Sequence, residues 1–366
     1  MKTPISKHNH PIRVLLVDDS VMALTVMQRL LATSPEIQVV GTARNGQEAL
    51  DLIPQLRPTI ICTDYLMPVM DGLELTRQIM ARFPTPVLVV SAVATERGTP
   101  TTFKLLEAGA LDIFPKPGAD VGARYSQLAQ ELAQKIRILA GVTVFARRGL
   151  VSLPTASADF SQPPRELASA KRISIVAIGA STGGPQALKE ILQHLPPNLS
   201  VPILCVQHIS DGFLQGLIDW LALSSRLRVK VAEANELAVP TVVYFPPDRM
   251  HLEVEHNGRL CLSRTKPVGG HCPSVNVLLK SVAKYFGRHA LGVLLTGMGS
   301  DGAEGLLAIA KAGGDTVAQS EESCVVFGMP KVAIDSGAAK YVLPVEAIAP
   351  KIVSLCAESD HLYVSP

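Results

Sequence analysis

Residues 13–140 alternate short apolar runs with segments of helical period. The apolar runs are RVLLVDD, QVVGTA, TIICTD, PVLVVSA and LDIFPKP. Runs that are apolar throughout are typical of parallel strands buried on both faces of a sheet. The last helical segment, YSQLAQELAQKIRILAG, keeps one apolar face through Leu128, Leu132, Ile136 and Leu139. Five such strand–helix units predict a doubly wound α/β domain with a five-stranded parallel sheet.

This alternation stops at Gly141. Residues 141–171 are rich in Pro, Ser and Ala and keep no period, which indicates a linker. Residues 1–12 and 359–366 are assigned as terminal tails, since no strand or helix pattern includes them.

A second alternating pattern occupies residues 172–358. Its apolar runs are ISIVAIGAS, VPILCVQHI, TVVYFPPDRMHLEVEHNGRLCLS, ALGVLLTGMGSDG and AAKYVLPVE. Within the third run, His256-Asn257-Gly258 is typical of a hairpin turn. The pattern predicts a second doubly wound, mostly parallel α/β domain that carries an antiparallel hairpin.

Composition agrees with two globular domains. The chain has 366 residues, of which 47% are hydrophobic and 18% charged. Lys and Arg number 34 against 32 Asp and Glu, and no basic stripe is present, so we expect no nucleic-acid partner. The N-terminal residues resemble no secretory signal, and no apolar run is long enough for membrane insertion, so we expect a cytoplasmic protein. The six cysteines have neither disulfide-framework nor zinc-site spacing and are expected to be reduced thiols.

Three acidic residues follow strands of the first domain. Asp18 and Asp19 end the first predicted strand and Asp64 ends the third, while Ser91 and Lys116 end the fourth and fifth. Because the carboxyl ends of parallel strands meet at one edge, we expect the three carboxylates to meet and to bind a hard cation such as Mg²⁺. The hydroxyl of Ser91 and the ammonium of Lys116 are suited to bind the oxygens of a phosphoryl group. The set predicts an aspartyl-phosphate site with Asp64 as the nucleophile.

The motifs LLVDDS, TDYLMPVMDG and FPKP resemble the signature of response-regulator receiver domains, which have a flavodoxin-like fold. This resemblance covers residues 13–140. It implies phosphoryl transfer from a histidine kinase to Asp64, with Mg²⁺ held by Asp19, Asp64 and the backbone carbonyl of Leu66. Two positions depart from the common pattern. Leu66 replaces a side chain that is often polar, and Ile113 stands where many receivers have an aromatic switch residue.

In the second domain, Ser181 occupies the centre of a G-x-S-x-G sequence between a predicted strand and a helix. A serine in such a turn acts either as an exposed nucleophile or as a helix N-cap. His208 ends the next apolar strand, and Asp301 follows the strand ALGVLLTG. These positions are expected to meet at one edge of the sheet as a Ser-His-Asp triad. Among the other histidines, His251 is a second candidate for contacting substrate.

The turn that contains Asp301 also fits a competing motif. TGMGSDG spells G-x-G-x-x-G through Gly297, Gly299 and Gly302, and Glu321 and Glu322 follow where a ribose-binding acid would be expected. Dinucleotide binding is therefore an alternative. It is disfavoured because a carboxylate inside the loop would repel the pyrophosphate, whereas the glycines also suit close approach of an acid to a histidine.

The stretches GASTGGPQAL, KPVGGHCPSVNVLL, GVLLTGMGSDGAEGL and SCVVFGMPKVAI resemble the catalytic domain of protein-glutamate methylesterases. That resemblance implies the triad Ser181, His208 and Asp301, with the backbone amides of Thr182 and Met298 as oxyanion donors. It also implies hydrolysis of glutamate methyl esters on chemoreceptors and deamidation of receptor glutamines, without a cofactor for the esterase.

Two departures from the methylesterase pattern lie in one segment. Gly269–Cys272 lacks an Asn and two Arg residues that are common in the family, and Asn276 replaces an Asp. A change in recognition of the receptor helices or in docking of the receiver is therefore expected. The resemblance spans both domains and predicts an esterase gated by phosphorylation. The competing classes are a transcriptional regulator, which would need a basic recognition helix, and a docking adaptor, in which the triad residues would be dispensable.

Overall fold

The computed structural model describes residues 10–92, 101–117, 121–144 and 173–357. The predicted linker from residue 145 onward, the C-terminal tail and most of the N-terminal tail lie outside these residues. By their contacts the residues form two compact units, each containing one large sheet, with Ser210–Trp220 grouped in the first unit. No helix in the described ranges combines the length and the apolarity that crossing a membrane requires.

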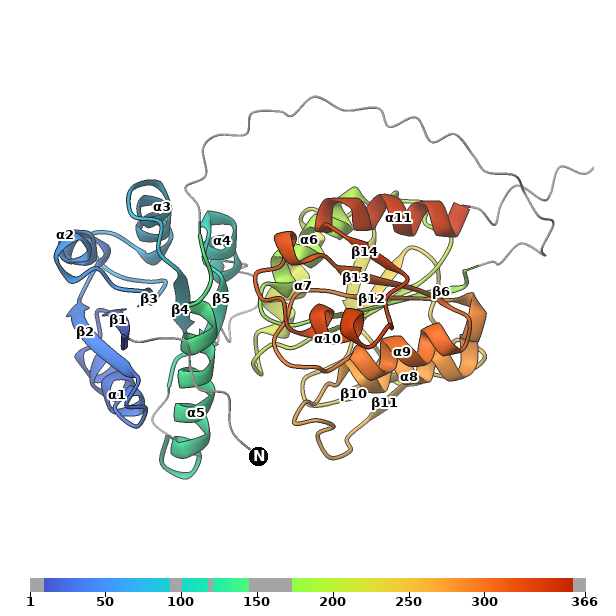
Figure 1. Ribbon diagram of the computed structural model, residues 1–366, viewed down its shortest axis with the longest axis horizontal. Helices are drawn as coiled ribbons and strands as arrows, with labels where there is room; N and C mark the ends of the chain where they lie inside the picture. The colour runs from blue at the N-terminus through green and yellow to red at the C-terminus, as the bar shows by residue number, and fades with distance from the viewer. Residues whose placement is uncertain (1–9, 93–100, 118–120, 145–172, 358–366) are drawn as a thin grey trace, which may run out of the picture. The chain divides into compact units, whose positions relative to one another are not determined.

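The first unit is built on a five-stranded sheet, as predicted (Figure 1). Its strands are β1 (Ile12–Val17), β2 (Ile37–Ala43), β3 (Ile60–Thr63), β4 (Val87–Ser91) and β5 (Asp112–Pro115). They pair in parallel in the order β2-β1-β3-β4-β5. In this order β1 lies beside β3 although β2 follows β1 along the chain. The two strands that carry the predicted aspartates are therefore neighbours at the topological switch point, where open α/β sheets bind ligands.

Helices cover both faces of this sheet. They are α1 (Val21–Leu31), α2 (Gly46–Leu56), α3 (Gly72–Arg82), α4 (Thr101–Ala108) and α5 (Val121–Leu139). Helix α1 packs with α5, and α3 packs between α2 and α4. The side chains of Ser20, Asn45 and Asp71 each accept a hydrogen bond from a backbone N–H in the first turn of α1, α2 and α3, which explains where these helices begin.

The second unit is built on a seven-stranded sheet in which every strand pair is parallel. The strand order is β14-β13-β12-β6-β7-β9-β8. The strands are β6 (Ile175–Ala180), β7 (Ile203–Gln207), β8 (Arg228–Val231), β9 (Val242–Phe245), β12 (Ala290–Leu294), β13 (Asp315–Gln319) and β14 (Tyr341–Leu343). The chain builds outward from β6 in one direction and then returns to add β12 on the other side. The switch point of this sheet therefore lies between β6 and β12.

The helices that follow in the chain are α6 (Gly184–His194), α7 (Leu214–Ala222), α8 (Val275–Phe286), α9 (Ala303–Lys311), α10 (Met329–Asp335) and α11 (Val345–Ala357). All of them belong to the second unit except α7, most of which is grouped with the first unit by its contacts. Figure 1 shows α6 and α11 on one face of the sheet and α8 and α9 on the other. Leu278, Val282, Leu306 and Ile309 on α8 and α9 are fully buried in the core beside Ile175 of β6. Burying such side chains stabilises the fold by about 1.5–3 kcal/mol each and fixes α8 against the sheet.

The predicted hairpin forms a separate two-stranded antiparallel sheet of β10 (His251–Val254) and β11 (Leu260–Ser263). Its turn is closed by Gly258, whose N–H donates to the carbonyl of Glu255 at 2.9 Å. Gly258 has φ 80°, a conformation that favours glycine. The chain continues from β11 through an exposed segment to the start of α8.

Candidate active site

Ser181, His208 and Asp301 lie at the carboxyl ends of three adjacent strands. Ser181 directly follows β6, His208 directly follows β7, and Asp301 lies in the turn after β12. The order β12-β6-β7 places these strand ends side by side. In the β6–β7 register Ala180 pairs with Gln207, and the N–H of His208 donates to the carbonyl of Ala180 at 2.9 Å. The backbones that carry Ser181 and His208 are therefore neighbours across one strand spacing.

Ser181 does not cap the helix that follows it. Helix α6 begins at Gly184 and its N-cap is Gly183, at φ 78°. The carbonyl of Ser181 accepts a hydrogen bond from the N–H of Gly184 at 2.8 Å, and its hydroxyl bonds no backbone donor of the helix. The N-cap alternative is therefore wrong, and the half-buried hydroxyl remains available at the turn.

The loop after β12 approaches this turn closely. A Cβ atom on Gly297 would lie 2.6 Å from the Cβ of Ser181 and 2.5 Å from the sulfur of Met329. Real Cβ atoms do not approach other atoms so closely, so only glycine fits at this position without a shift of its neighbours. The first glycine of the G-x-G-x-x-G sequence thus serves the packing of the serine turn.

His208 and Asp301 are in direct contact. His208 Nε2 lies 2.9 Å from Asp301 Oδ2, and the two side chains are 11% and 3% exposed. Because a carboxylate only accepts, we assign the proton to Nε2. The other ring nitrogen, Nδ1, is buried and has no hydrogen-bond partner among the described residues, Ser181 included. The imidazole is thus anchored on one nitrogen, and its second nitrogen is able to accept a proton.

The amino end of α8 holds the Asp301 carboxylate. Oδ1 accepts from the hydroxyl of Ser274 at 2.9 Å and from the N–H of Asn276 at 3.0 Å, while Oδ2 accepts from the N–H of Val275 at 2.7 Å as well as from His208. Burial alone would raise the pKa of Asp301. The hydrogen bond to His208 and its charge, together with the two amide donors, outweigh burial and lower the pKa to about 2. The carboxylate is therefore ionised throughout the physiological range.

The residues that support Asp301 were missed in the sequence analysis. Ser274 immediately precedes an apolar-periodic helix, the usual place of an N-cap, and this signal could have identified it. Asn276 accepts the N–H of Gly305 on its Oδ1 at 2.8 Å, which ties α8 to α9. His251 is fully buried, and its Nδ1 accepts the N–H of Ser274 at 3.1 Å. The expectation that His251 contacts substrate was therefore wrong.

Gln207 bridges the serine turn and the histidine. Its side-chain amide donates to the carbonyls of Ser181 and His208, both at 2.8 Å. It is 4% exposed, so these bonds form away from solvent. No sequence pattern indicated this bridge, because it depends on the register of β6 and β7.

Thr182 and Met298 occupy the two turns that meet at the site. Thr182 is 7% exposed, and its carbonyl accepts from the hydroxyl of Thr296 at 2.9 Å. Its own N–H donates to no residue in the described part of the chain. Met298 follows Gly297 in the loop after β12. Asp301 in this loop bonds His208 and the N–H of Val275, so its carboxylate is used inside the domain, which disfavours the dinucleotide alternative.

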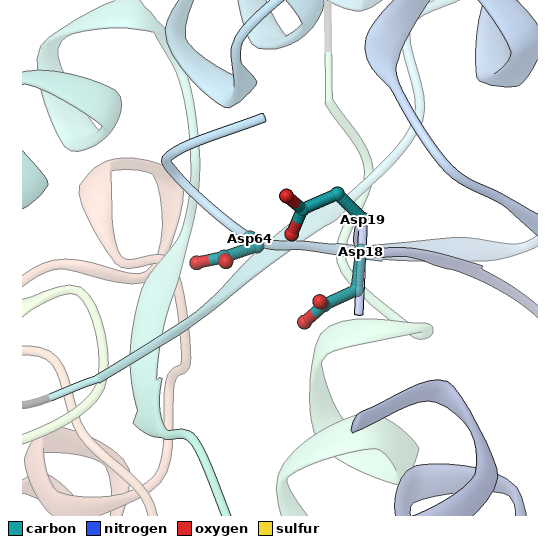
Figure 2. Close-up of side chains that lie close together, drawn as sticks. All are labelled: Asp18, Asp19 and Asp64. Atoms are coloured by element: carbon teal, nitrogen blue, oxygen red, sulfur yellow. The ribbon is translucent and has the colours of Figure 1, made fainter. Parts of the chain in front are cut away.

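The first unit has its own acidic site. Ligand oxygens of Asp18, Asp19 and Asp64 lie within 4.8 Å of one another, and Figure 2 shows the three side chains at neighbouring strand ends. The ammonium of Lys116 pairs with Asp18 at 2.7 Å and with Asp64 at 2.8 Å. Ser91 is buried at the end of β4, and its carbonyl accepts from the N–H of Lys116 at 2.8 Å. All five predicted residues thus lie at one edge of the sheet.

Burial raises the pKa of Asp64, although Lys116 and the N–H of Tyr65 oppose it; the nearby charge of Asp18 adds to the increase. For Lys116, burial alone would lower the pKa, but the bonds to Asp18 and Asp64 outweigh it and raise the pKa. Crowded carboxylates with oxygen-only donors suit a hard divalent cation, so the donor set fits Mg²⁺.

The two departures in this unit have different surroundings. Leu66 is 70% exposed beside the acidic site. Ile113 on β5 is 6% exposed and belongs to the core, so its side chain packs among buried neighbours.

Comparisons with known proteins match both units. Residues 176–352 match the family described as CheB methylesterase, and residues 14–122 match the response regulator receiver domain. A protein-glutamate methylesterase/protein-glutamine glutaminase of Syntrophus aciditrophicus is 42% identical, with 94% of this chain and 98% of that protein covered. A protein of the same name from Myxococcus xanthus is 43% identical, with 94% of each chain covered. The crystal structure of the Thermotoga maritima CheB methylesterase catalytic domain, at 40% identity and TM-score 0.49, covers 50% of this chain and 98% of that one. The chain therefore belongs to the protein-glutamate methylesterase/protein-glutamine glutaminase family, and it carries both a receiver match and a CheB methylesterase match.

Proposed function

We propose that this protein hydrolyses methyl esters of glutamate side chains on chemoreceptors and deamidates receptor glutamines, under the control of phosphorylation. In this proposal residues 13–140 are the receiver domain and residues 172–358 the catalytic domain. The observation that carries it is the contact of a buried His208–Asp301 pair beside the turn that bears Ser181. Family membership supplies the substrate class.

In the proposed mechanism, Ser181 Oγ attacks the ester carbonyl carbon and gives its proton to His208 Nδ1. This nitrogen is the acceptor because Nε2–H is held by Asp301 at 2.9 Å. The imidazolium that forms is stabilised by the ionised carboxylate. As the tetrahedral intermediate collapses, the bond to the methoxy oxygen breaks, and that oxygen takes the proton from Nδ1 and leaves as methanol.

The second half of the reaction reuses the same groups. His208 Nδ1 removes a proton from water, which attacks the acyl-enzyme, and the proton returns to Ser181 Oγ as the receptor's glutamate side chain is released with a free carboxylate. For a glutamine substrate the first leaving group is ammonia. We assign the oxyanion donors to the backbone amides of Thr182 and Met298. The Thr182 N–H donates to no described residue, so it is available for a developing negative oxygen.

We assign phosphoryl transfer from a histidine kinase to the carboxylate of Asp64. The residues proposed to hold Mg²⁺ are Asp19, Asp64 and the backbone carbonyl of Leu66, and the ion supplies positive charge that offsets repulsion between the carboxylates and the phosphoryl group. Lys116, which bonds Asp18 and Asp64, is positioned to contact a phosphoryl oxygen. Ser91 is assigned to a second oxygen.

Replacing Ser181 by Ala tests the esterase assignment. The variant should lose roughly 10³-fold or more in kcat, because it lacks the nucleophile. The assay is methanol release from a receptor fragment that bears glutamate methyl esters. Ser174→Ala is the matched control, since this exposed serine precedes the opposite end of the same strand and should leave the rate unchanged.

Labelling with a fluorophosphonate probe separates the proposed hydrolase from an adaptor. We expect the probe to modify Ser181 in the wild type and to leave the Ser181→Ala variant unlabelled. A Ser181→Ala protein that hydrolyses receptor esters at a near-normal rate would show that another group is the nucleophile.

A further inference from the structure

A second imidazole lies flat against His208. The rings of His208 and His271 have centroids 4.0 Å apart and planes that differ by 2°. His271 was not predicted as a site residue, because it lies in a loop between the hairpin and α8 and does not stand at a strand end. A near-parallel stack at this distance brings the two rings into van der Waals contact over their faces.

The chain around His271 holds the ring in place. Val268 and His271 exchange two backbone hydrogen bonds, of 3.0 and 3.1 Å, across Gly269 and Gly270. Both glycines have positive φ, at 61° and 88°, as a tight two-residue hairpin turn requires. Three residues further on, Ser274 bonds Asp301. The segment that presents His271 is therefore anchored to the same carboxylate that anchors His208.

His208 needs this second restraint. Its only side-chain hydrogen bond in the described structure is Nε2 to Asp301, and Nδ1 has no partner. The torsion that rotates a histidine ring has a broad energy profile, so one hydrogen bond leaves the ring able to pivot about that contact. In the proposed mechanism Nδ1 has to receive the proton of Ser181, and pivoting would change the direction in which Nδ1 points. A flat ring packed on the face of His208 opposes this rotation, while Asp301 acts on its edge.

The protonation state of His271 suits the same role. Burial lowers the pKa of His271, the nearby charge of His208 lowers it further, and Asp301 opposes them. His271 is therefore neutral at neutral pH. A neutral aromatic face attracts a cation that forms against it, whereas a second imidazolium at 4.0 Å would repel it.

We propose that His271 is a positioning residue for the esterase reaction, which fixes the ring plane of His208 through face-to-face stacking and stabilises its imidazolium form. This inference rests on the proposed function, since that function makes His208 the general base. His271 acts through His208 and is assigned no contact with the substrate.

Three substitutions in the full-length protein test the inference. His271→Phe keeps a planar aromatic face and should retain kcat within about threefold of the wild type. His271→Leu keeps bulk without an aromatic face, and His271→Ala removes both, so each should lower kcat by roughly tenfold or more with little change in KM. His256→Ala, which removes an exposed histidine in the hairpin turn, is the matched control and should match the wild type.

Nitrogen-15 NMR of the imidazoles supplies a readout that does not depend on turnover. In the wild type and in His271→Phe, we expect the neutral imidazole of His208 to carry its proton on Nε2, the nitrogen that bonds Asp301. In His271→Ala the two tautomers of His208 should be mixed, because the ring pivots. A substitution that removes packing elsewhere in the domain would not change the nitrogen-15 signals of the His208 imidazole.

Each other outcome overturns the inference. Equal kcat in all three variants would show that the stack is incidental; equal loss in all three would show that the imidazole of His271 is needed for a polar role. Full activity in both Phe and Leu would reduce His271 to filling space. Activity of the Ser181→Ala protein would instead refute the proposed function, and the NMR comparison would still report whether His271 orients His208.

Discussion

Replacing Asp301 by Asn should disable the site, and the structure shows why. Each carboxylate oxygen accepts one backbone N–H, from Val275 at Oδ2 and from Asn276 at Oδ1. In the Asp301→Asn variant one carboxylate oxygen is replaced by an amide NH₂ group, which is a donor. At either oxygen position this group would face a backbone N–H, which is also a donor, so one hydrogen bond would be lost. If the amide nitrogen faces His208, Nε2 must accept and the ring proton moves to Nδ1. The base would then be blocked at the nitrogen that has to receive the proton of Ser181.

The expected magnitudes follow from these contacts. In other serine hydrolases the wrong imidazole tautomer lowers kcat by roughly 10⁴-fold, and we expect a loss of 10³-fold or more here. The pKa of Asp301 is lowered from its ordinary value of 3.8 to about 2. This difference corresponds to about 2 kcal/mol in the free energy of unfolding. Because the folded pKa is depressed, this stabilisation is present above pH 4 and is lost as the pH falls through about 2.

Two assays check both effects. Methanol release gives kcat, and urea unfolding followed by circular dichroism between pH 7 and pH 2 gives the difference in stability, which should shrink toward the acid end. Asp315→Asn is the control, since this buried carboxylate begins β13, at the opposite edge of the sheet, where it pairs with Lys340. It should affect stability without changing kcat. An Asp301→Asn protein that is folded and has kcat within threefold of the wild type would refute the orienting role of Asp301.

Two further predictions concern the close packing of the serine turn and the receiver site. Gly297→Ala would place a Cβ 2.6 Å from the Cβ of Ser181, so the turn that bears Ser181 must shift. We expect Ser181 of this variant to react at least tenfold more slowly with a fluorophosphonate probe. An unchanged rate would contradict this packing argument. Asp64→Asn removes the proposed phosphoryl acceptor, so the esterase rate should no longer respond to a small-molecule phosphodonor with Mg²⁺. A response that persists would place phosphorylation elsewhere.

The strand ends that carry the site were predictable because each lies next to a continuous apolar run. Ser181, His208 and Asp301 follow such runs, and parallel strands place their carboxyl ends at one edge. The order of the strands was not predictable in the same way. The strand before Asp301 is more than a hundred residues from the strand before Ser181, yet β12 pairs directly with β6. That pairing depends on how all the helices pack on the sheet, and no local pattern records it.

Side-chain contacts between distant segments also could not be predicted from the sequence. Ser274 could have been found as an N-cap, but its bond to Asp301 joins positions 27 residues apart. The stack of His271 on His208 requires both a hairpin turn and the start of α8 to be in place. In isolation, a histidine after two glycines in an exposed segment gave no reason to choose it over the other histidines.

The segment between the hairpin and α8 therefore acts on the chemistry from two sides. Ser274, its last residue, bonds the Asp301 carboxylate, and His271 covers the face of the His208 ring. The departures at Gly269 and Gly270 fall in the turn between Val268 and His271, where an added Cβ would meet nothing within 4 Å. Both glycines have positive φ, so a larger side chain at either position would strain this turn even though the space around it is open. The departures at Gly269 and Gly270 therefore favour the turn that places His271 against His208, and they couple any difference in substrate recognition here to the histidine pair.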